Sequence, residues 1–292
     1  MKKEKSKAWK RISLLLDILI IGVITAGVVL MLYPPVSYWW NGMHESRAIA
    51  AYVEKVADNS AEDNQRMRDE ASAYNQTLLT EEDRFRPAPE EDARYRAALD
   101  ITGTGIMGYV NIPSIHVHLP IYHGTDPAIL EIAVGHMEGS SLPVGGSGTH
   151  CVISGHTGLP SAKLFTDLVK VELGDTFTLS VLDQTLTYQV DQILVVLPEE
   201  MDALAIDPDQ DYCTLLTCTP YGVNSHRLLV RGHRIPTVPD DRGITADAVQ
   251  LEPAYIVPYL AAVLIAMVFG YLLMLFLRYW RRRKAGQGGG TS

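Results

Sequence analysis

Residues 212–232, YCTLLTCTPYGVNSHRLLVRG, decide the fold of this chain. They contain two short β-rich segments, 212–218 and 226–232, separated by Pro, Gly and Asn, which are residues typical of turns. The pattern predicts two strands joined by a loop. Six further segments of the same kind lie upstream, at 107–112, 116–122, 149–155, 176–182, 185–190 and 192–197. Eight short strands with few long helices predict a mainly β fold, a barrel or a sandwich.

The stretches around these strands have other patterns. Residues 44–79 predict two helices, separated at Ser60-Ala-Glu-Asp63, which has the form of a capping box. Their modest apolar periodicity suggests that they pack on the β domain and do not form its core. Residues 80–100 predict a polar loop, 129–134 and 161–168 predict short helices between strands, and 236–254 predict a polar linker.

Two long apolar runs, 12–33 and 256–277, flank this region. Each is long enough to cross the roughly 30 Å hydrocarbon core of a bilayer as a helix. Basic clusters lie outside both runs, in 2–11 and 278–284, which places both termini in the cytoplasm and the middle of the chain outside. Pro34-Pro35 is expected to end the first span. A cleaved signal peptide is the alternative, but the run is longer than a usual h-region and no small-x-small site follows, so we favour an uncleaved anchor.

Charge narrows the possible functions. The segment between the apolar runs holds 14 of the 25 basic residues and 32 of the 34 acidic residues. A domain with this excess of negative charge is not expected to bind nucleic acid or anionic lipid surfaces.

The chain has only three cysteines, Cys151, Cys213 and Cys218. A dense disulfide framework is therefore excluded, and at least one thiol stays free or pairs between molecules. Cys151 and Cys213 each precede, by five residues, a residue considered below for catalysis. If their strands are neighbours the two thiols could be close, but two buried free cysteines are favoured over a disulfide, which needs restrictive geometry.

A nucleophilic thiol needs a base and a positive environment, because the thiolate is the reacting species. Cys218 ends one predicted strand, and Arg227 follows nine residues later. His156 lies between two glycines, just after the predicted strand 149–155. Residues on loops at one rim of a rigid sheet can converge, so these three side chains predict a catalytic site.

Several motifs together resemble the sortase family. Thr214-Leu-Leu-Thr-Cys218, followed by TPYGVNSHRLLVRG, resembles the sortase signature. Ser154-Gly-His156 with the following GLPSAKLF resembles the His loop of the class C, pilin-polymerising branch, as do LPIYHGT (119–125), GHMEGSSLPVGG (135–146) and the two-span layout. The resemblance covers about residues 107–235.

The resemblance implies an eight-stranded sortase-type β-barrel and a two-step transpeptidation without a cofactor or metal. Cys218 would be the nucleophile on an LPXTG-like sorting signal, His156 the acid and base, and Arg227 the group that holds the carbonyl or oxyanion. The acceptor in class C members is a pilin lysine. The branch also has a lid with an Asp-Pro-aromatic motif. Here the nearest match is Asp83-Arg-Phe85, which lacks the proline; it also reads as a helix start, Thr80-Glu-Glu-Asp83.

The sequence leaves rivals open: a sortase that anchors proteins to the cell wall, a hydrolytic cysteine peptidase, and a membrane-tethered binding module without catalysis. The expected partners are pilin or surface-protein subunits of a Gram-positive-type envelope, at the cell membrane, with no nucleic acid. The predicted organisation is a cytoplasmic tail (1–11), a transmembrane anchor (12–33), a helical extension with the lid (34–104), the catalytic barrel (105–236), a linker (237–254), a transmembrane helix (255–278) and a cytoplasmic tail (279–292).

Overall fold

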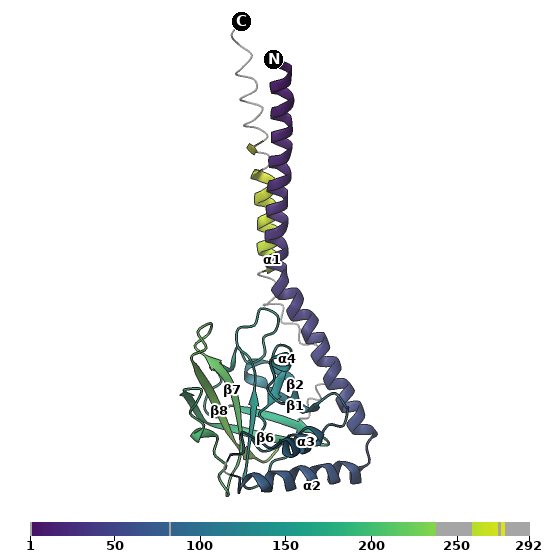
Figure 1. Ribbon diagram of the computed structural model, residues 1–292, viewed down its shortest axis with the longest axis vertical. Helices are drawn as coiled ribbons and strands as arrows, with labels where there is room; N and C mark the ends of the chain where they lie inside the picture. Colours follow the sequence, from purple (N-terminus) through teal and green to yellow (C-terminus); the bar gives the residue numbers. More distant parts are fainter. Residues whose placement is uncertain (1, 82, 238–258, 274–275, 278–292) are drawn as a thin grey trace. The chain divides into compact units, whose positions relative to one another are not determined.

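The computed structural model describes residues 2–81, 83–237, 259–273 and 276–277 (Figure 1). The chain divides into two compact units, one made of residues 1–39 and 250–292 and the other of residues 40–249. The predicted linker 236–254 and the C-terminal tail lie almost wholly outside the described residues.

The described part of the smaller unit is helical, and it is mostly apolar beyond the basic residues 2–11. Its first helix belongs to α1 (Lys2–Asp58), which continues through Pro34 and Pro35 although the sequence predicts that the span ends there. Each proline lacks the backbone N–H that an interior helical position donates, which is why the sequence favours an end at this point. Leu14–Asp58 is the one described helix that is long and apolar enough to cross a membrane; the predicted second span contains a shorter apolar helix, Tyr259–Leu273.

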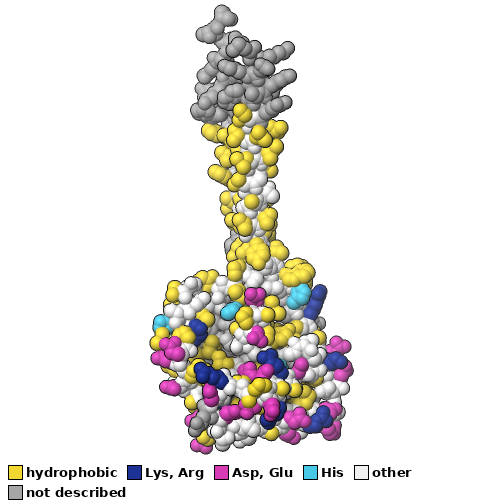
Figure 2. All heavy atoms as spheres, viewed as in Figure 1, with side chains coloured by type: hydrophobic (Ala, Val, Ile, Leu, Met, Phe, Trp, Pro, Cys, Tyr) yellow, Lys and Arg dark blue, Asp and Glu magenta, His cyan; other side chains and the backbone are white. Residues whose placement is uncertain are grey.

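The surface of this unit matches a lipid environment better than water. Leu15 and Leu30 of α1 are largely exposed, and the face seen in Figure 2 is hydrophobic along the described part of the helices. A continuous apolar surface of this extent is unusual for a helix in water. On the larger unit the same view shows mixed charges in which Asp and Glu predominate.

The larger unit contains a closed barrel of eight strands in the order β1-β2-β3-β4-β7-β8-β6-β5, which confirms the predicted fold class. β2 pairs with β3, and β4 with β7, in parallel; the other pairs are antiparallel. The strands are β1 (Ile106–Ile112), β2 (Val117–His123), β3 (Val134–His136), β4 (Thr149–Ser154), β5 (Thr176–Val181), β6 (Gln184–Val196), β7 (Asp211–Thr219) and β8 (His226–Ile235).

Two strand predictions were wrong. β3 was not predicted, because its three residues are too few to show a pattern; the helix predicted at 129–134 overlaps it only at Val134, and the helix observed there, α4, is Pro127–Leu130. The segments 185–190 and 192–197 form one strand, β6. Its pairing with β8 shifts between Val190 and Gln192, so Asp191 is the extra residue of a bulge. Its carboxylate accepts two hydrogen bonds of 3.0 Å from Arg231, and the polar residue therefore does not end the strand.

The helix predictions were partly confirmed. α1 and α2 (Ala61–Leu78) are separated as expected, and Ser60 caps α2 by accepting a hydrogen bond from Asp63 N at 3.0 Å. The predicted loop 80–100 contains a further helix, α3 (Pro89–Ala97), because Pro89 and the Glu91 carboxylate, which accepts from Ala88 N, provide a helix start. The helix predicted at 161–168 does not form; its last residue begins the 3₁₀ turn η2 (Leu168–Lys170), and the other short 3₁₀ turns of the described barrel are η1 (Pro113–Ile115) and η3 (Asp202–Leu204).

The helices of the extension pack on the barrel through buried polar anchors. The Tyr52 hydroxyl of α1 donates to Met107 O at 3.0 Å, and Asn75 of α2 exchanges two hydrogen bonds with the backbone of Leu142. The buried Tyr95 hydroxyl of α3 accepts from Gly124 N at 2.8 Å. Paired in this way, buried polar groups fix where each helix docks and leave the barrel interior apolar.

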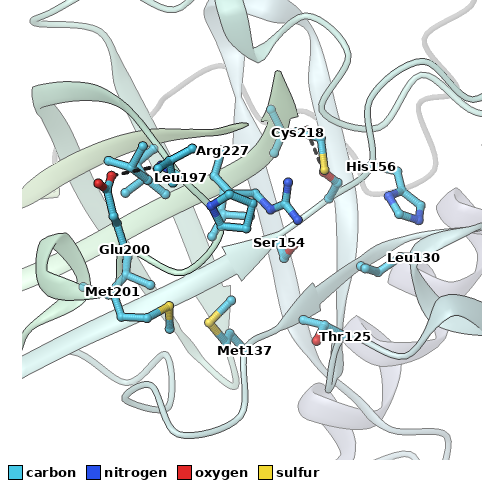
Figure 3. Close-up of a pocket in the computed structure, with 17 residues that line it drawn as sticks. Thr125, Leu130, Met137, Ser154, His156, Leu197, Glu200, Met201, Cys218 and Arg227 are labelled. Carbon is cyan, nitrogen blue, oxygen red and sulfur yellow. Dashed lines mark hydrogen bonds between the residues drawn. The ribbon is translucent and has the colours of Figure 1, made fainter. Parts of the chain in front are cut away.

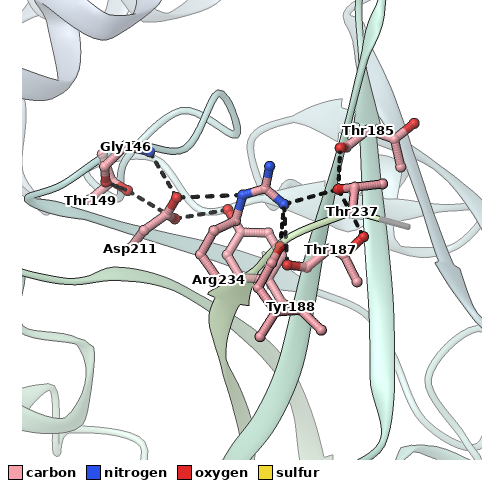
Figure 4. A network of polar contacts seen from close by, with 9 residues as sticks. Gly146, Thr149, Thr185, Thr187, Tyr188, Asp211, Arg234 and Thr237 are labelled. Carbon is pink, nitrogen blue, oxygen red and sulfur yellow. Dashed lines mark hydrogen bonds and ion pairs between the residues drawn. The ribbon is translucent and has the colours of Figure 1, made fainter. Parts of the chain in front are cut away.

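β7, which carries Cys218, is held at its first residue. The Asp211 carboxylate accepts hydrogen bonds from Gly146 N at 2.8 Å and from the Tyr188 hydroxyl at 3.0 Å, and it lies 3.8 Å from Arg234 Nε (Figure 4). These contacts join β7 to β6, to β8 and to the turn before β4. They fix the start of the strand whose other end lies at the candidate site.

Candidate active site

Cys218 and Arg227 lie opposite each other near the loop between β7 and β8. They are direct partners in the antiparallel register of these strands, and both are half-buried. Directly opposite residues of an antiparallel pair place their side chains on the same face, with Cβ atoms about 5 Å apart. In Figure 3 the guanidinium of Arg227 points toward the side of the pocket where Cys218 lies. The spacing of nine residues between Cys218 and Arg227 therefore follows from the β7–β8 hairpin, which places the two residues opposite each other.

His156 reaches the same place from β4. Because β4 and β7 are parallel and Ser154 is paired with Leu216, the C-terminal ends of the two strands meet at one edge of the barrel. His156 lies two residues beyond Ser154, and Cys218 lies two residues beyond Leu216. In the view of Figure 3, Cys218 lies between Arg227 and His156.

Hydrogen bonds fix the backbone that carries both side chains. Gly155 N donates to Leu216 O at 3.0 Å, and the buried Thr217 hydroxyl donates to Gly155 O at 2.7 Å. A Cβ at Gly155 would lie 2.7 Å from Phe165 Cδ2, so only glycine allows this close approach. The residues just before His156 and Cys218 are therefore bonded directly to one another.

All three side chains line one pocket of about 220 Å³. Its other wall is apolar except for Glu200 and comes from the turn after β3, from the connection between β6 and β7, and from the faces of β6 to β8; the apolar residues are Met137, Val196, Leu197, Pro198, Met201, Leu204, Leu216 and Leu229. The arrangement can bind an apolar peptide segment beside a thiol, an imidazole and a guanidinium. Residue type and spacing did not single out this wall, because an apolar loop residue carries no chemical signal of its own.

Of the two predicted lid residues, only Phe85 contacts residues of the pocket wall. Asp83 is exposed and stands in a turn, not at a helix start. Phe85 packs against the apolar cluster of Val152, Leu204, Leu216 and Leu229, three members of which line the pocket. Between them, Arg84 stacks on the Phe85 ring at 4.3 Å and donates hydrogen bonds to Gly139 O at 2.8 Å and to Leu204 O at 2.7 Å. The segment is thus tied to both sides of the apolar wall by Arg84, which the sequence did not single out.

The other two cysteines lie away from the pocket lining. Cys151 of β4 is the direct partner of Cys213 of β7, both thiols are buried, and both are free. Burial raises the pKa of the Cys213 thiol well above its ordinary range. The condition that their strands are neighbours is met, and the absence of a disulfide between the two cysteines stays a prediction.

Among the described residues, no three His, Cys, Asp or Glu side chains are grouped so that they could hold a metal ion.

Known proteins share this architecture and sequence. The family model of the sortase domain matches residues 110–235. The crystal structure of sortase C1 from Streptococcus agalactiae is 48% identical, with a TM-score of 0.64, and the match covers 66% of this chain and 100% of that one. The crystal structure of sortase C from Streptococcus pneumoniae, a study that also concerns pilin substrate specificity, is 42% identical with a TM-score of 0.58. The match again covers 66% of this chain and 100% of that one.

A curated relative is more distant. Sortase D of Bacillus subtilis is 26% identical over 148 residues, which is 50% of this chain and 72% of the relative. Together with the closed barrel, these likenesses establish that the chain belongs to the sortase family of cysteine transpeptidases, among the class C sortases.

Proposed function

We propose that this protein uses Cys218, His156 and Arg227 to cleave an LPXTG-like sorting signal and to transfer the acyl group to an amine, most favourably a lysine of a pilin subunit. One observation carries the proposal: Cys218 faces Arg227 in register, and His156 arrives from the strand paired with β7, so that all three line a pocket with an apolar wall.

In the first step, the Cys218 thiolate attacks the carbonyl carbon of the Thr–Gly bond. The negative charge that develops on the carbonyl oxygen lies where the Arg227 guanidinium can stabilise it. The C–N bond then breaks, and His156 gives its proton to the leaving glycine amine. The product is a thioester between Cys218 and the threonine of the sorting signal.

In the second step, an acceptor amine attacks the thioester. His156 takes the proton from the amine, the C–S bond breaks, and the thiolate returns to Cys218. The new bond is an amide, and no oxidant or other reactant is needed. The apolar wall would bind the Leu and Pro side chains of the sorting signal and so place the scissile bond beside the thiol.

The likeness to Streptococcus pneumoniae sortase C, whose pilin specificity is described, favours a pilin lysine as acceptor over a cell-wall amine. The segment Asp83–Phe85 is proposed as a lid, because Phe85 packs on the cluster that forms the apolar wall and Arg84 ties the segment to both sides of it. We further propose that both apolar runs span the cell membrane and that the barrel lies on the outer side.

Intact-mass spectrometry of the full-length protein in detergent tests this function. The protein is mixed with an LPXTG-type peptide, with and without an amine acceptor, and Cys218→Ala serves as the blank. An acyl adduct on Cys218 that leaves only onto the acceptor supports the transpeptidase. An adduct that hydrolyses equally fast without acceptor indicates a peptidase, and no adduct with any sorting peptide, even in a Phe85→Ala background, favours a non-catalytic binding module.

A further inference from the structure

The loop between β7 and β8, residues 220–225, presents two large apolar side chains to solvent. Tyr221 is 70% exposed and Val223 is 69% exposed, the highest values among the large hydrophobic side chains described in residues 40–237. The loop joins Cys218 to Arg227, yet neither Tyr221 nor Val223 lines the pocket. An exposed apolar pair that adjoins a reactive thiol but stays outside its pocket is a candidate surface for a second molecule.

The backbone of this loop and the Tyr221 ring are held by contacts within the barrel. Val223 N and Asn224 N both donate to Pro220 O, at 3.0 and 2.9 Å, and the Asn224 carbonyl in turn accepts from Arg227 Nη1 at 3.3 Å. The Tyr221 ring lies against Gly158, where an added Cβ would be 2.9 Å from Cε2 and where φ is +77°. A surface ordered before binding loses little conformational entropy when a partner docks.

The contact with Gly158 also shows on which side of Cys218 this surface lies. Gly158 lies two residues after His156, so Tyr221 is on the His156 side of the thiol. The apolar wall at Met137, Met201 and Leu204 is the part of the pocket suited to the sorting signal. The acceptor amine must reach the thioester where His156 can take its proton, which is the side on which the Tyr221 ring lies.

The composition of the loop suits an amine that has to lose a proton. Residues 219–226, TPYGVNSH, contain no acidic side chain. An ammonium group brought against an apolar surface without a carboxylate partner is desolvated, and its pKa falls. The neutral amine that results is the form that attacks a thioester.

We propose that Tyr221 and Val223 form the docking surface for the second substrate, the folded subunit that presents the acceptor amine. This inference rests on the proposed transpeptidase function. It separates the two substrates: the pocket binds the sorting signal, and the β7–β8 loop binds the protein that receives it. Tyrosine is one of the residue types enriched among the side chains that contribute most to binding in protein interfaces, so Tyr221 is the expected main anchor and Val223 extends the apolar contact.

The test compares Tyr221→Ser and Val223→Ser with Leu173→Ser, a matched control at a side chain that is 66% exposed on the turn before β5. Each full-length variant is first acylated with an LPXTG-type peptide. The acyl-enzyme is then chased either with hydroxylamine or with a purified sorting-signal-bearing subunit protein of the same cell envelope, from which the signal has been deleted so that it acts only as acceptor.

We expect acylation and hydroxylaminolysis to stay within about twofold of the unsubstituted protein in all variants, while transfer to the protein acceptor falls about tenfold in the two loop variants alone, the scale of a lost interface anchor. Unchanged transfer to the protein acceptor would overturn the proposal, as would an equal loss with hydroxylamine, which would mean that the loop only shapes the site. Failure of the proposed function itself would be seen earlier, as absence of an acyl-enzyme in the unsubstituted protein.

Discussion

The hydroxyl of Thr217 donates a 2.7 Å hydrogen bond to the carbonyl oxygen of Gly155. This hydrogen bond joins the residue that precedes Cys218 to the residue that precedes His156. Both residues are buried. The contact crosses from β7 to the end of β4, and its strength bears directly on how closely Cys218 and His156 are held relative to one another.

Replacing Thr217 by Val keeps the shape of the side chain and removes the donor. We expect the free energy of unfolding to fall by about 1–3 kcal/mol, because a buried carbonyl loses its partner. We also expect the rate of acylation by a sorting peptide to fall by about tenfold or more, because small misplacements of reacting groups are costly. Urea unfolding and single-turnover mass spectrometry measure the two effects. Thr217→Ser retains the hydroxyl and serves as control; equal rates in the Val and Ser variants would contradict a positioning role.

The three cysteines should differ in reactivity. Cys218 is half-buried at the pocket, whereas Cys151 and Cys213 are buried partners within the barrel wall. Alkylation of the native protein should therefore modify one thiol, and alkylation after denaturation without reductant should modify three. Tandem mass spectrometry assigns the sites. A mass two units below the reduced form, with one reactive thiol after denaturation, would instead show a disulfide between β4 and β7.

Removal of the Phe85 side chain should expose the pocket. Phe85→Ala is expected to raise the rate at which a bulky thiol reagent modifies Cys218 severalfold, since the ring packs on residues of the pocket wall. Arg84→Ala should also raise the labelling rate of Cys218, because it removes the hydrogen bonds to Gly139 O and Leu204 O. Arg86→Ala, an exposed arginine of the same segment, is the matched control. Equal labelling rates in all four proteins would exclude a lid at this position while leaving the catalytic assignment untouched.

Acid should weaken the barrel through His150. This side chain contacts Ala205 O at 2.8 Å and the Thr214 hydroxyl at 2.7 Å, and burial lowers its pKa from 6.5 to about 4. Between pH 6.5 and 4 this histidine binds a proton in the unfolded chain but not in the folded chain. Its contribution to the free energy of unfolding is therefore complete above pH 6.5 and is lost as the pH falls toward 4. The expected loss is on the order of 2–3 kcal/mol.

Urea unfolding at pH 7 and pH 5 checks this expectation. His150→Asn removes the titrating ring but keeps a donor and an acceptor, so its free energy of unfolding should depend less steeply on pH than that of the unsubstituted protein. The burial of His118 and His123 lowers the pKa of each in the same direction and leaves part of the slope in place. A slope unaffected by the substitution would assign the acid sensitivity to those groups.

The short β-rich segments and the turn residues between them were enough to predict a mainly β fold, and the resemblance then favoured a barrel over a sandwich. Alternation contributed little, because β6 alternates buried and less buried positions over most of its length whereas β4 is buried throughout. These sequence patterns were not enough where tertiary pairing decides. β3 has three residues, all buried, and exists because β2 and β4 bind it on either side. β6 continues past Asp191 because β8 pairs with it on both sides of the bulge.

In the candidate site, too, some residues could be predicted from the sequence and others could not. Cys218 and His156 could be singled out because a free thiol and a histidine beside glycine each lie at the end of a predicted strand, whereas Arg227 was assigned through the resemblance to the sortase signature; the structure brings all three to one pocket. Met137, Met201 and Leu204 could not, since they matter through where the chain folds them. Arg84 was overlooked for a similar reason: its partners are backbone carbonyls 55 and 120 residues away, and no local pattern reports them.

The pairing of β4 with β7 also bears on how such a protein can diversify. The reacting side chains extend from strands whose offset is fixed by a backbone ladder, by Asp211 at one end and by Thr217 at the other. Much of the apolar wall comes from the connection between β6 and β7, which lies outside that ladder. Changes among the apolar side chains of this connection can therefore alter the peptide preference, provided that the backbone carbonyls of Leu204 and Ala205 keep their contacts with Arg84 and His150, while the chemistry stays in register.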